Sequence, residues 1–195
     1  MKKRNLIAAL ALSLTLTACV VPTGPVEVTR FNRAADGYVY GNGSYAVSPA
    51  KAGDTLSLSP YLAAVSREMQ QIGYSERFDN SDIIAEVTVN ARKIESLQRS
   101  PVSVGVGSST GSYGSGVGVG LGFDLGALGN KDRVETTLSV RLLRRADNLV
   151  IWEGRATQSA GATSPAAQPG IAASKLAAAL FDDFPGESGQ TVTVP

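Results

Sequence analysis

The chain has 195 residues, with 18 basic and 17 acidic side chains, a formal net charge of +1 and no histidine. A charge so close to neutral gives no electrostatic reason to expect nucleic-acid binding. The absence of histidine excludes Ser-His-Asp and Cys-His catalysis as well as histidine-ligated zinc.

Residues 1–18 have the composition of a secretory signal peptide. A basic start at residues 1–4 precedes an apolar stretch, residues 6–14, which is shorter than the ~20 residues that span a bilayer. Leu-Thr-Ala-Cys at residues 16–19 resembles the lipobox of bacterial lipoproteins. We therefore expect cleavage before Cys19 and lipidation of that cysteine. The alternative is an ordinary signal peptide that ends at a cysteine by chance.

Cys19 is the chain's one cysteine, so no disulfide can form within the chain. Conversion to a thioether would also leave no thiol for catalysis or for binding a metal. Acyl chains on Cys19 would anchor the protein, since each buried CH₂ contributes about 0.8 kcal/mol. Val20, rather than an aspartate, follows the cysteine, and we therefore expect the periplasmic face of the outer membrane.

The segment after the cysteine predicts a tether and then the start of the domain. Two prolines and a glycine within residues 19–36 indicate a flexible connection, so the domain is expected to begin at residue 37. Residues 38–40 and 44–47 look like one strand, interrupted at Gly41-Asn42-Gly43 by a bulge or a tight hairpin.

A helix is predicted after this strand. Ser59 is suited to the N-cap and Pro60 to the first helical position. Gly73 is placed to end the helix in a left-handed conformation, with Tyr74 folding back as its apolar partner. One apolar stripe is formed by Leu62, Val65, Met69 and Ile72. A strand with alternating faces is predicted next, over residues 82–92.

Residues 102–130 form a glycine-rich insert that holds ten of the 21 glycines. In residues 102–107 and 117–123, apolar residues alternate with glycine or serine. This alternation places the apolar side chains on one face of a strand. The segment lacks the Gly-Lys-Ser/Thr ending and the following helix of a phosphate-binding loop. It is either a long, mobile hairpin or a surface for self-association or membrane contact. Such a surface would be formed by Val117, Val119, Leu121 and Phe123.

After the insert, residues 133–143 and 149–157 are predicted to form an antiparallel hairpin, with a turn at Asp147-Asn148. A helix is expected over residues 169–184, ended by Pro185-Gly186. Residues 187–195 have the composition of a disordered tail.

The order of these elements predicts an α+β fold within residues 37–186. Each helix and each strand has one apolar face, and one arrangement buries all of them. We therefore expect a two-layer sandwich, in which two helices pack on one face of a mostly antiparallel four-stranded sheet. The glycine-rich insert would lie between the middle strands.

Few residues outside the insert are candidates for a site. Trp152 is expected in the core, with ligand stacking as the alternative. Asp182 and Asp183 look like a solvated helix end rather than a metal site. Three arginines near the hairpin are expected to be solvated charges, with lipid phosphate as a minor option: Arg141, Arg144 and Arg145. Early tyrosines suit either strands or a recognition surface: Tyr38, Tyr40, Tyr45 and Tyr61.

Several of these segments resemble the DUF4136 type of bacterial envelope lipoprotein. The segments are Met69–Tyr74, Ser81–Ala85, Thr137–Leu143, the turn at Asn148, Val150–Gly154 and Phe184-Pro185. The glycine-rich insert between the middle strands is similar as well. The resemblance implies an envelope lipoprotein domain of uncharacterised function, and it carries over no catalytic residue.

We therefore expect a lipid-anchored, periplasm-facing envelope protein that acts as a non-catalytic binding or assembly module. Its expected partners are the membrane, through the lipid, and an envelope protein or a second copy of itself. No cofactor, metal, nucleotide or nucleic acid is expected, and without histidine or a free thiol it is not expected to be an enzyme. The alternative is a self-assembling or membrane-contacting structural protein that acts through residues 102–130.

Overall fold

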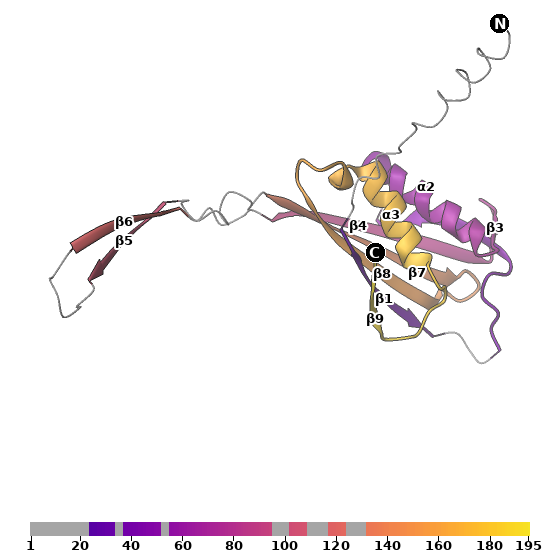
Figure 1. The fold of residues 1–195 in the computed structure, drawn as a ribbon. Helices are drawn as coiled ribbons and strands as arrows, with labels where there is room; N and C mark the ends of the chain where they lie inside the picture. Colours follow the sequence, from indigo (N-terminus) through magenta and orange to yellow (C-terminus); the bar gives the residue numbers. More distant parts are fainter. Residues whose placement is uncertain (1–23, 34–36, 52–54, 95–101, 109–116, 124–131) are drawn as a thin grey trace, which may run out of the picture.

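The computed structural model describes residues 24–33, 37–51, 55–94, 102–108, 117–123 and 132–195. Its main body has two layers, with helices α2 (Thr55–Gln71) and α3 (Pro169–Phe181) side by side on one face of a sheet (Figure 1). The sheet has seven strands in the order β3-β2-β4-β7-β8-β1-β9. Their bounds are Val26–Asn32 (β1), Ser44–Pro49 (β2), Ser75–Glu76 (β3), Ile83–Ile94 (β4), Arg133–Arg144 (β7), Leu149–Gly161 (β8) and Thr191–Val194 (β9).

The predicted sheet is wrong in size and in type, although the fold is α+β. Four mostly antiparallel strands were expected, whereas the sheet has seven strands and is mixed, because β2 runs parallel to both β3 and β4. Strand β1 lies in the segment predicted as a tether, and β9 lies in the predicted tail. Strand β9 is an edge strand, whose Thr191–Val194 pair with Val26–Thr29, whereas β1 lies between β9 and β8 and pairs with both.

The early strand is also shorter than predicted. Only Ser44–Pro49 form β2, and Tyr38 and Tyr40 lie in the preceding loop. The carboxylate of Asp82 explains the parallel pairing, because its Oδ2 accepts hydrogen bonds from the Ser44 N–H at 2.8 Å and the Ser44 hydroxyl at 2.6 Å. These bonds align the start of β2 with the start of β4, and Tyr45 pairs with Ile83.

Helix α2 starts earlier than predicted but ends as predicted. It begins at Thr55, so Pro60 lies inside the helix and Ser59 is not the N-cap. The proline removes a single intrahelical hydrogen bond near the exposed end. At the other end, Gly73 has a φ of 106°, and Tyr74 is buried, its N–H donating to the Met69 carbonyl at 3.1 Å. Both details confirm the predicted helix end.

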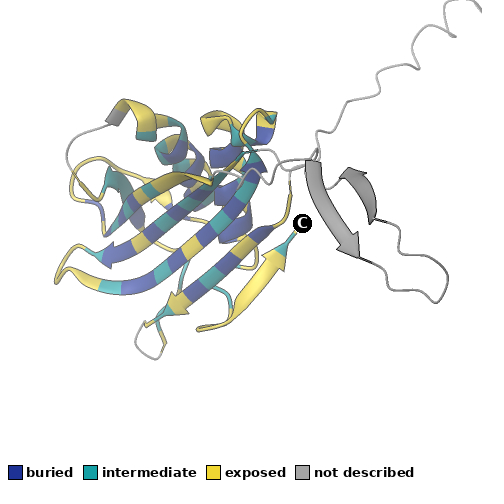
Figure 2. Cartoon of the chain, turned by 90° about the vertical axis from the view of Figure 1, so that its left-hand side faces the viewer, coloured by how far each residue is buried: buried dark blue, intermediate teal, exposed yellow. Residues whose placement is uncertain are grey.

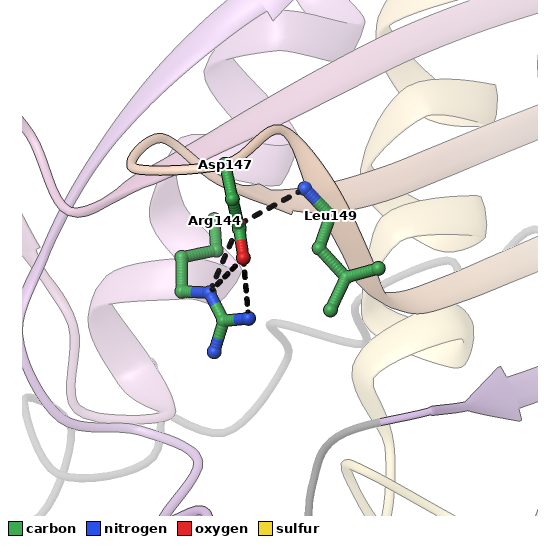
Figure 3. A network of polar contacts seen from close by, with 3 residues as sticks. All are labelled: Arg144, Asp147 and Leu149. Atoms are coloured by element: carbon green, nitrogen blue, oxygen red, sulfur yellow. Dashed lines mark hydrogen bonds and ion pairs between the residues drawn. The ribbon is translucent and has the colours of Figure 1, made fainter.

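The predicted hairpin is confirmed by the antiparallel pairing of β7 with β8. Asn148 takes a φ of 56° in the turn. Figure 3 shows how the turn is closed: the Arg144 guanidinium faces the Asp147 carboxylate at 2.7 Å, and the Leu149 N–H donates to the same carboxylate. A register shift at Leu142 lets two consecutive residues of β8 reach the core, Ile151 and Trp152.

Trp152 is the centre of the helix-side core, which confirms its predicted structural role. It is fully buried, stacks on Phe181 with ring centroids 5.4 Å apart, and donates from Nε1 to the Pro185 carbonyl at 2.9 Å. A Cβ at Gly154 would stand 2.4 Å from the indole ring and 2.7 Å from Leu180. The glycine therefore makes room for the tryptophan under α3.

Arg30 joins β1 to the C-terminal end of α3, which lies at Phe181 rather than at residue 184 as predicted. Its guanidinium is buried and donates to the carbonyls of Leu180 and Ala179 at 2.9 Å and of Asp182 at 2.6 Å. These carbonyls have no partner within the helix and form the negative end of its dipole. Burial lowers the pKa of Arg30, and the nearby carboxylates of Asp182 and Asp183 partly oppose this effect.

We expect Arg30→Met to lower the free energy of unfolding by at least about 2 kcal/mol, because it leaves buried helix carbonyls without a donor. Urea denaturation followed by tryptophan fluorescence measures this loss. Arg33→Met, at an exposed position just beyond β1, is the control and should change stability by less than about 0.5 kcal/mol. Equal losses in the two variants would contradict the role given to Arg30.

Candidate functional site

The two faces of the seven-stranded sheet differ in what covers them. The helices cover one face, and along the long strands buried residues alternate with more exposed ones (Figure 2). Alternation places the helix-side residues of β4, such as Ala85 and Val87, in the core. The side chains between them point to the opposite face, which no described helix covers. We call this the open face.

Cross-strand register arranges the side chains of the open face in rows. Across β4, β7, β8 and β1, the rows are Glu86–Arg141–Glu153–Phe31, Thr88–Ser139–Arg155–Thr29, Asn90–Thr137–Thr157–Glu27 and, over the first three strands, Arg92–Glu135–Ser159. Apart from Phe31, every side chain in these rows carries a hydroxyl, an amide or a charge, so this part of the face is polar. The next row, Ile84–Leu143–Val150, is apolar.

A hollow of about 380 Å³ lies on this face. It is lined by Thr88, Asn90, Arg92, Glu135, Thr137, Ser139 and Arg155. A second hollow of about 300 Å³ lies where β1 and β8 meet, lined by Phe31, Arg33, Val150, Trp152 and Glu153. The Phe31 ring is 53% exposed there. We name the first the hydroxyl hollow and the second the Phe31 hollow.

Most charges near the hydroxyl hollow are paired. The Arg92 guanidinium contacts the Glu135 carboxylate at 2.7 Å, and this hydrogen-bonded pair raises the pKa of Arg92. Arg141 contacts Glu86 at 3.3 Å. In contrast, no hydrogen bond or ion pair joins the exposed Arg155 guanidinium to any residue that the structure describes.

The hydroxyl hollow can bind a polar molecule by hydrogen bonds. Hydroxyl and amide groups both donate and accept, and a guanidinium offers five N–H donors. Across the described ranges, no three acidic, histidine or cysteine side chains lie close enough together to hold a metal ion. Burial raises the pKa of Tyr74, but this tyrosine lies in the helix-side core and not in the hollow.

The predicted site residues lie elsewhere. Cys19 is outside the described residues. The apolar positions of the insert lie on β6 (Val117–Phe123), which pairs antiparallel with β5 (Val102–Ser108) in a separate two-stranded sheet. The register pairs Val117 with Ser108, Val119 with Val106, Leu121 with Val104 and Phe123 with Val102.

The other candidates fall into structural positions. Asp182 and Asp183 are exposed at the end of α3, as predicted, and Tyr45 and Tyr61 belong to the core. Arg145 is exposed, as predicted, and its guanidinium also donates to the Ser81 carbonyl at 2.7 Å and to the Ser81 hydroxyl at 2.8 Å. It thus holds the chain just before β4.

No pattern in the sequence predicts the hydroxyl hollow. Its residues come from three strands, and Thr88 and Arg155 are far apart in the chain. The feature of the sequence that points to such a surface is the serine, threonine and asparagine content of the polar positions in the alternating strands. That signal marks a polar face but does not select residues within it.

A protein family and an individual protein are similar in sequence to this chain. Residues 27–186 match the model of a family described as a domain of unknown function, DUF4136. The uncharacterized protein ZMO1243 of Zymomonas mobilis is 46% identical over 63 residues, which are 32% of this chain and 24% of that protein. The chain thus spans about a quarter of that relative.

One solved structure shows a similar fold, and a second superposes less well. A PDZ domain protein from Parabacteroides distasonis superposes with a TM-score of 0.54 at 13% identity, over 88% of this chain and 39% of that one. A PelC dodecamer from Paraburkholderia phytofirmans has a TM-score of 0.45 at 12% identity, over 83% and 99% of the two chains. Within the described residues, no helix has the length and hydropathy needed to cross a membrane.

Proposed function

The chain belongs to the DUF4136 family, a domain of unknown function, and we propose that it is a lipid-anchored envelope protein that binds a polar partner through its open face. In this proposal it is a non-catalytic module attached to the outer membrane through Cys19 and facing the periplasm. The hydroxyl hollow is the observation that carries the binding role.

The arrangement of the sheet supports binding at the open face. The helices already bury the apolar side of the sheet, so the polar side is free to contact another molecule. The long strands that form the hollow pair along their whole length, which holds its side chains on a rigid support. Such a surface is suited to recognition by many weak hydrogen bonds rather than to chemistry at one atom.

The chain between the cysteine and the sheet supports close attachment to a membrane. Strand β1 begins at Val26, seven residues after Cys19. At full extension, seven residues reach at most about 25 Å. A lipid on Cys19 would therefore keep the sheet close to the bilayer, where it would meet partners at the membrane surface.

Replacing Cys19 should release the protein from the membrane. We expect the unaltered protein to sediment with outer membranes and Cys19→Ala to lose that association, because the acyl chains supply the anchor. Membrane fractionation with immunoblotting measures the distribution, and the intact mass reports the lipid. Ser13→Ala, within the apolar stretch, is the matched control. Sedimentation of Cys19→Ala with the membrane would contradict lipid anchoring.

A photocrosslinker on the open face should capture the partner. We expect p-benzoylphenylalanine at Thr137 to give adducts in living cells, detected by a shift on a denaturing gel. The control carries the same group at Ala63, which is exposed on α2 in the helix layer. Adducts from Ala63 and not from Thr137 would show that the open face is not the binding surface.

Self-association through residues 102–130 is a second candidate function. The observation that favours it is that β5 and β6 form a sheet of their own rather than joining the seven-stranded sheet. A two-stranded ribbon alone is marginally stable, and its outer edges present unpaired backbone groups. A second copy of the ribbon would satisfy those groups.

Deleting residues 104–124 distinguishes this second candidate. If the ribbon drives assembly, the full chain in mild detergent should form oligomers, and the deletion should reduce them to monomers. Mass photometry measures both species, and the urea midpoint of the deletion variant checks that the main body still folds. A monomeric full chain would rule out self-association through the ribbon.

A further inference from the structure

Arg155 differs from the other arginines that accompany it on the open face. Arg92 contacts Glu135, Arg141 contacts Glu86, and Arg133 donates to Ser159 at 2.8 Å. The Arg155 guanidinium has no such partner among the described residues, although it lines the hydroxyl hollow. A planar fork of N–H donors in this position matches the two oxygens of a carboxylate.

We propose that the hydroxyl hollow binds an acidic saccharide, with its carboxylate on Arg155 and its hydroxyl groups on the polar side chains around it. This inference rests on the proposed function, because it names the ligand of the same open face. The surrounding groups are Thr88, Asn90, Thr137 and Ser139. Each of them can donate and accept, as a sugar hydroxyl does.

The charges around the hollow disfavour a multiply charged anion relative to a monoanion. Arg92 and Glu135 neutralise each other, which leaves one positive charge in the lining, that of Arg155. Glu153 precedes Arg155 on the same face, and Glu27 lies diagonally across the β1–β8 pairing. These two carboxylates repel a doubly charged phosphate more strongly than a singly charged carboxylate, which the guanidinium fork would hold chiefly by two directional hydrogen bonds.

The shape of the face favours a saccharide over a small isolated anion. The hollow, of about 380 Å³, has the size of a small-molecule site and lies on an open sheet rather than in a closed cavity. Phe31 pairs with Glu153 in the row next to the one that holds Arg155 and Thr29. Its exposed ring offers an apolar surface to the less polar face of a second sugar unit.

The test is the binding of maltotrionate, a trisaccharide acid with a single carboxylate, to the full chain in detergent, measured by isothermal titration calorimetry. Neutral maltotriose and inorganic phosphate are the comparison probes. We expect binding of maltotrionate alone, and Arg155→Gln should weaken it at least about tenfold, because a charge-assisted bidentate pair is lost. Arg155→Lys keeps the charge without the planar fork and should fall between the two.

Arg67→Gln is the matched control, since Arg67 is exposed on α2 in the other layer and the charge change is the same. It should leave binding unchanged. The urea midpoint of Arg155→Gln should also stay unchanged, which separates a binding loss from unfolding. Equal binding of maltotriose, competition by equimolar phosphate, or unaltered binding in Arg155→Gln would overturn the inference.

If a second copy of the chain or another protein binds the open face instead of a saccharide, the binding and crosslinking experiments give different results. If no saccharide binds and the full chain is a dimer that Arg155→Gln dissociates, a second copy occupies the face and the inference is overturned. If no saccharide binds but the crosslinker at Thr137 captures a protein, the inference fails while the proposed function stands. If neither experiment gives a positive result, both fail.

Discussion

The C-terminal end of α3 depends on a cation supplied from the other end of the chain. Arg30, in the first strand, satisfies three carbonyls that the helix itself leaves without donors. The same region holds the chain that follows, since the Asn32 amide donates to the Gly186 carbonyl at 3.0 Å and the Gly189 N–H donates to the Arg30 carbonyl at 2.8 Å. A Cβ at Gly186 would meet the Arg30 side chain at 2.6 Å.

This contact links the two layers of the fold. With α3 held against β1, its inner face covers Trp152, and the chain after the helix turns back so that β9 pairs with β1. The helix-side core is then closed, and the sheet is left with one uncovered side. Because side chains alternate along a strand, the same strands that bury apolar residues under the helices present their polar residues on the open face.

The open face is also where the structure and the proposed function meet. Ion pairs between neighbouring strands neutralise most of its charges, and exposed pairs of this kind contribute little to stability. What they do provide is a patterned surface in which Arg155 has no hydrogen-bond or ion-pair partner among the residues that the structure describes. A lipid on Cys19, seven residues before β1, would present that surface within reach of the bilayer.

Local patterns in the sequence determined a substantial part of this protein. Alternation predicted β4, β7 and β8, the Asp147-Asn148 pair predicted the hairpin turn, and Gly73 predicted the end of α2, because each signal acts within a few residues. The burial of Trp152 and the family resemblance followed from the same segments. The resemblance of residues 16–19 to a lipobox is likewise a local signal, and lipidation of Cys19 stays a prediction.

Only the tertiary structure decided the sheet's edges and the candidate site. Strand β9 is defined by pairing with β1 across more than 160 residues, and β1 by pairing with both β8 and β9. Neither strand carries a signal strong enough to outweigh its tether-like or tail-like composition. The role of Arg30 depends on carbonyls about 150 residues away. The hydroxyl hollow exists because register aligns Thr88, Ser139 and Arg155 in one row, and register between strands distant in the chain is set by packing rather than by any local motif.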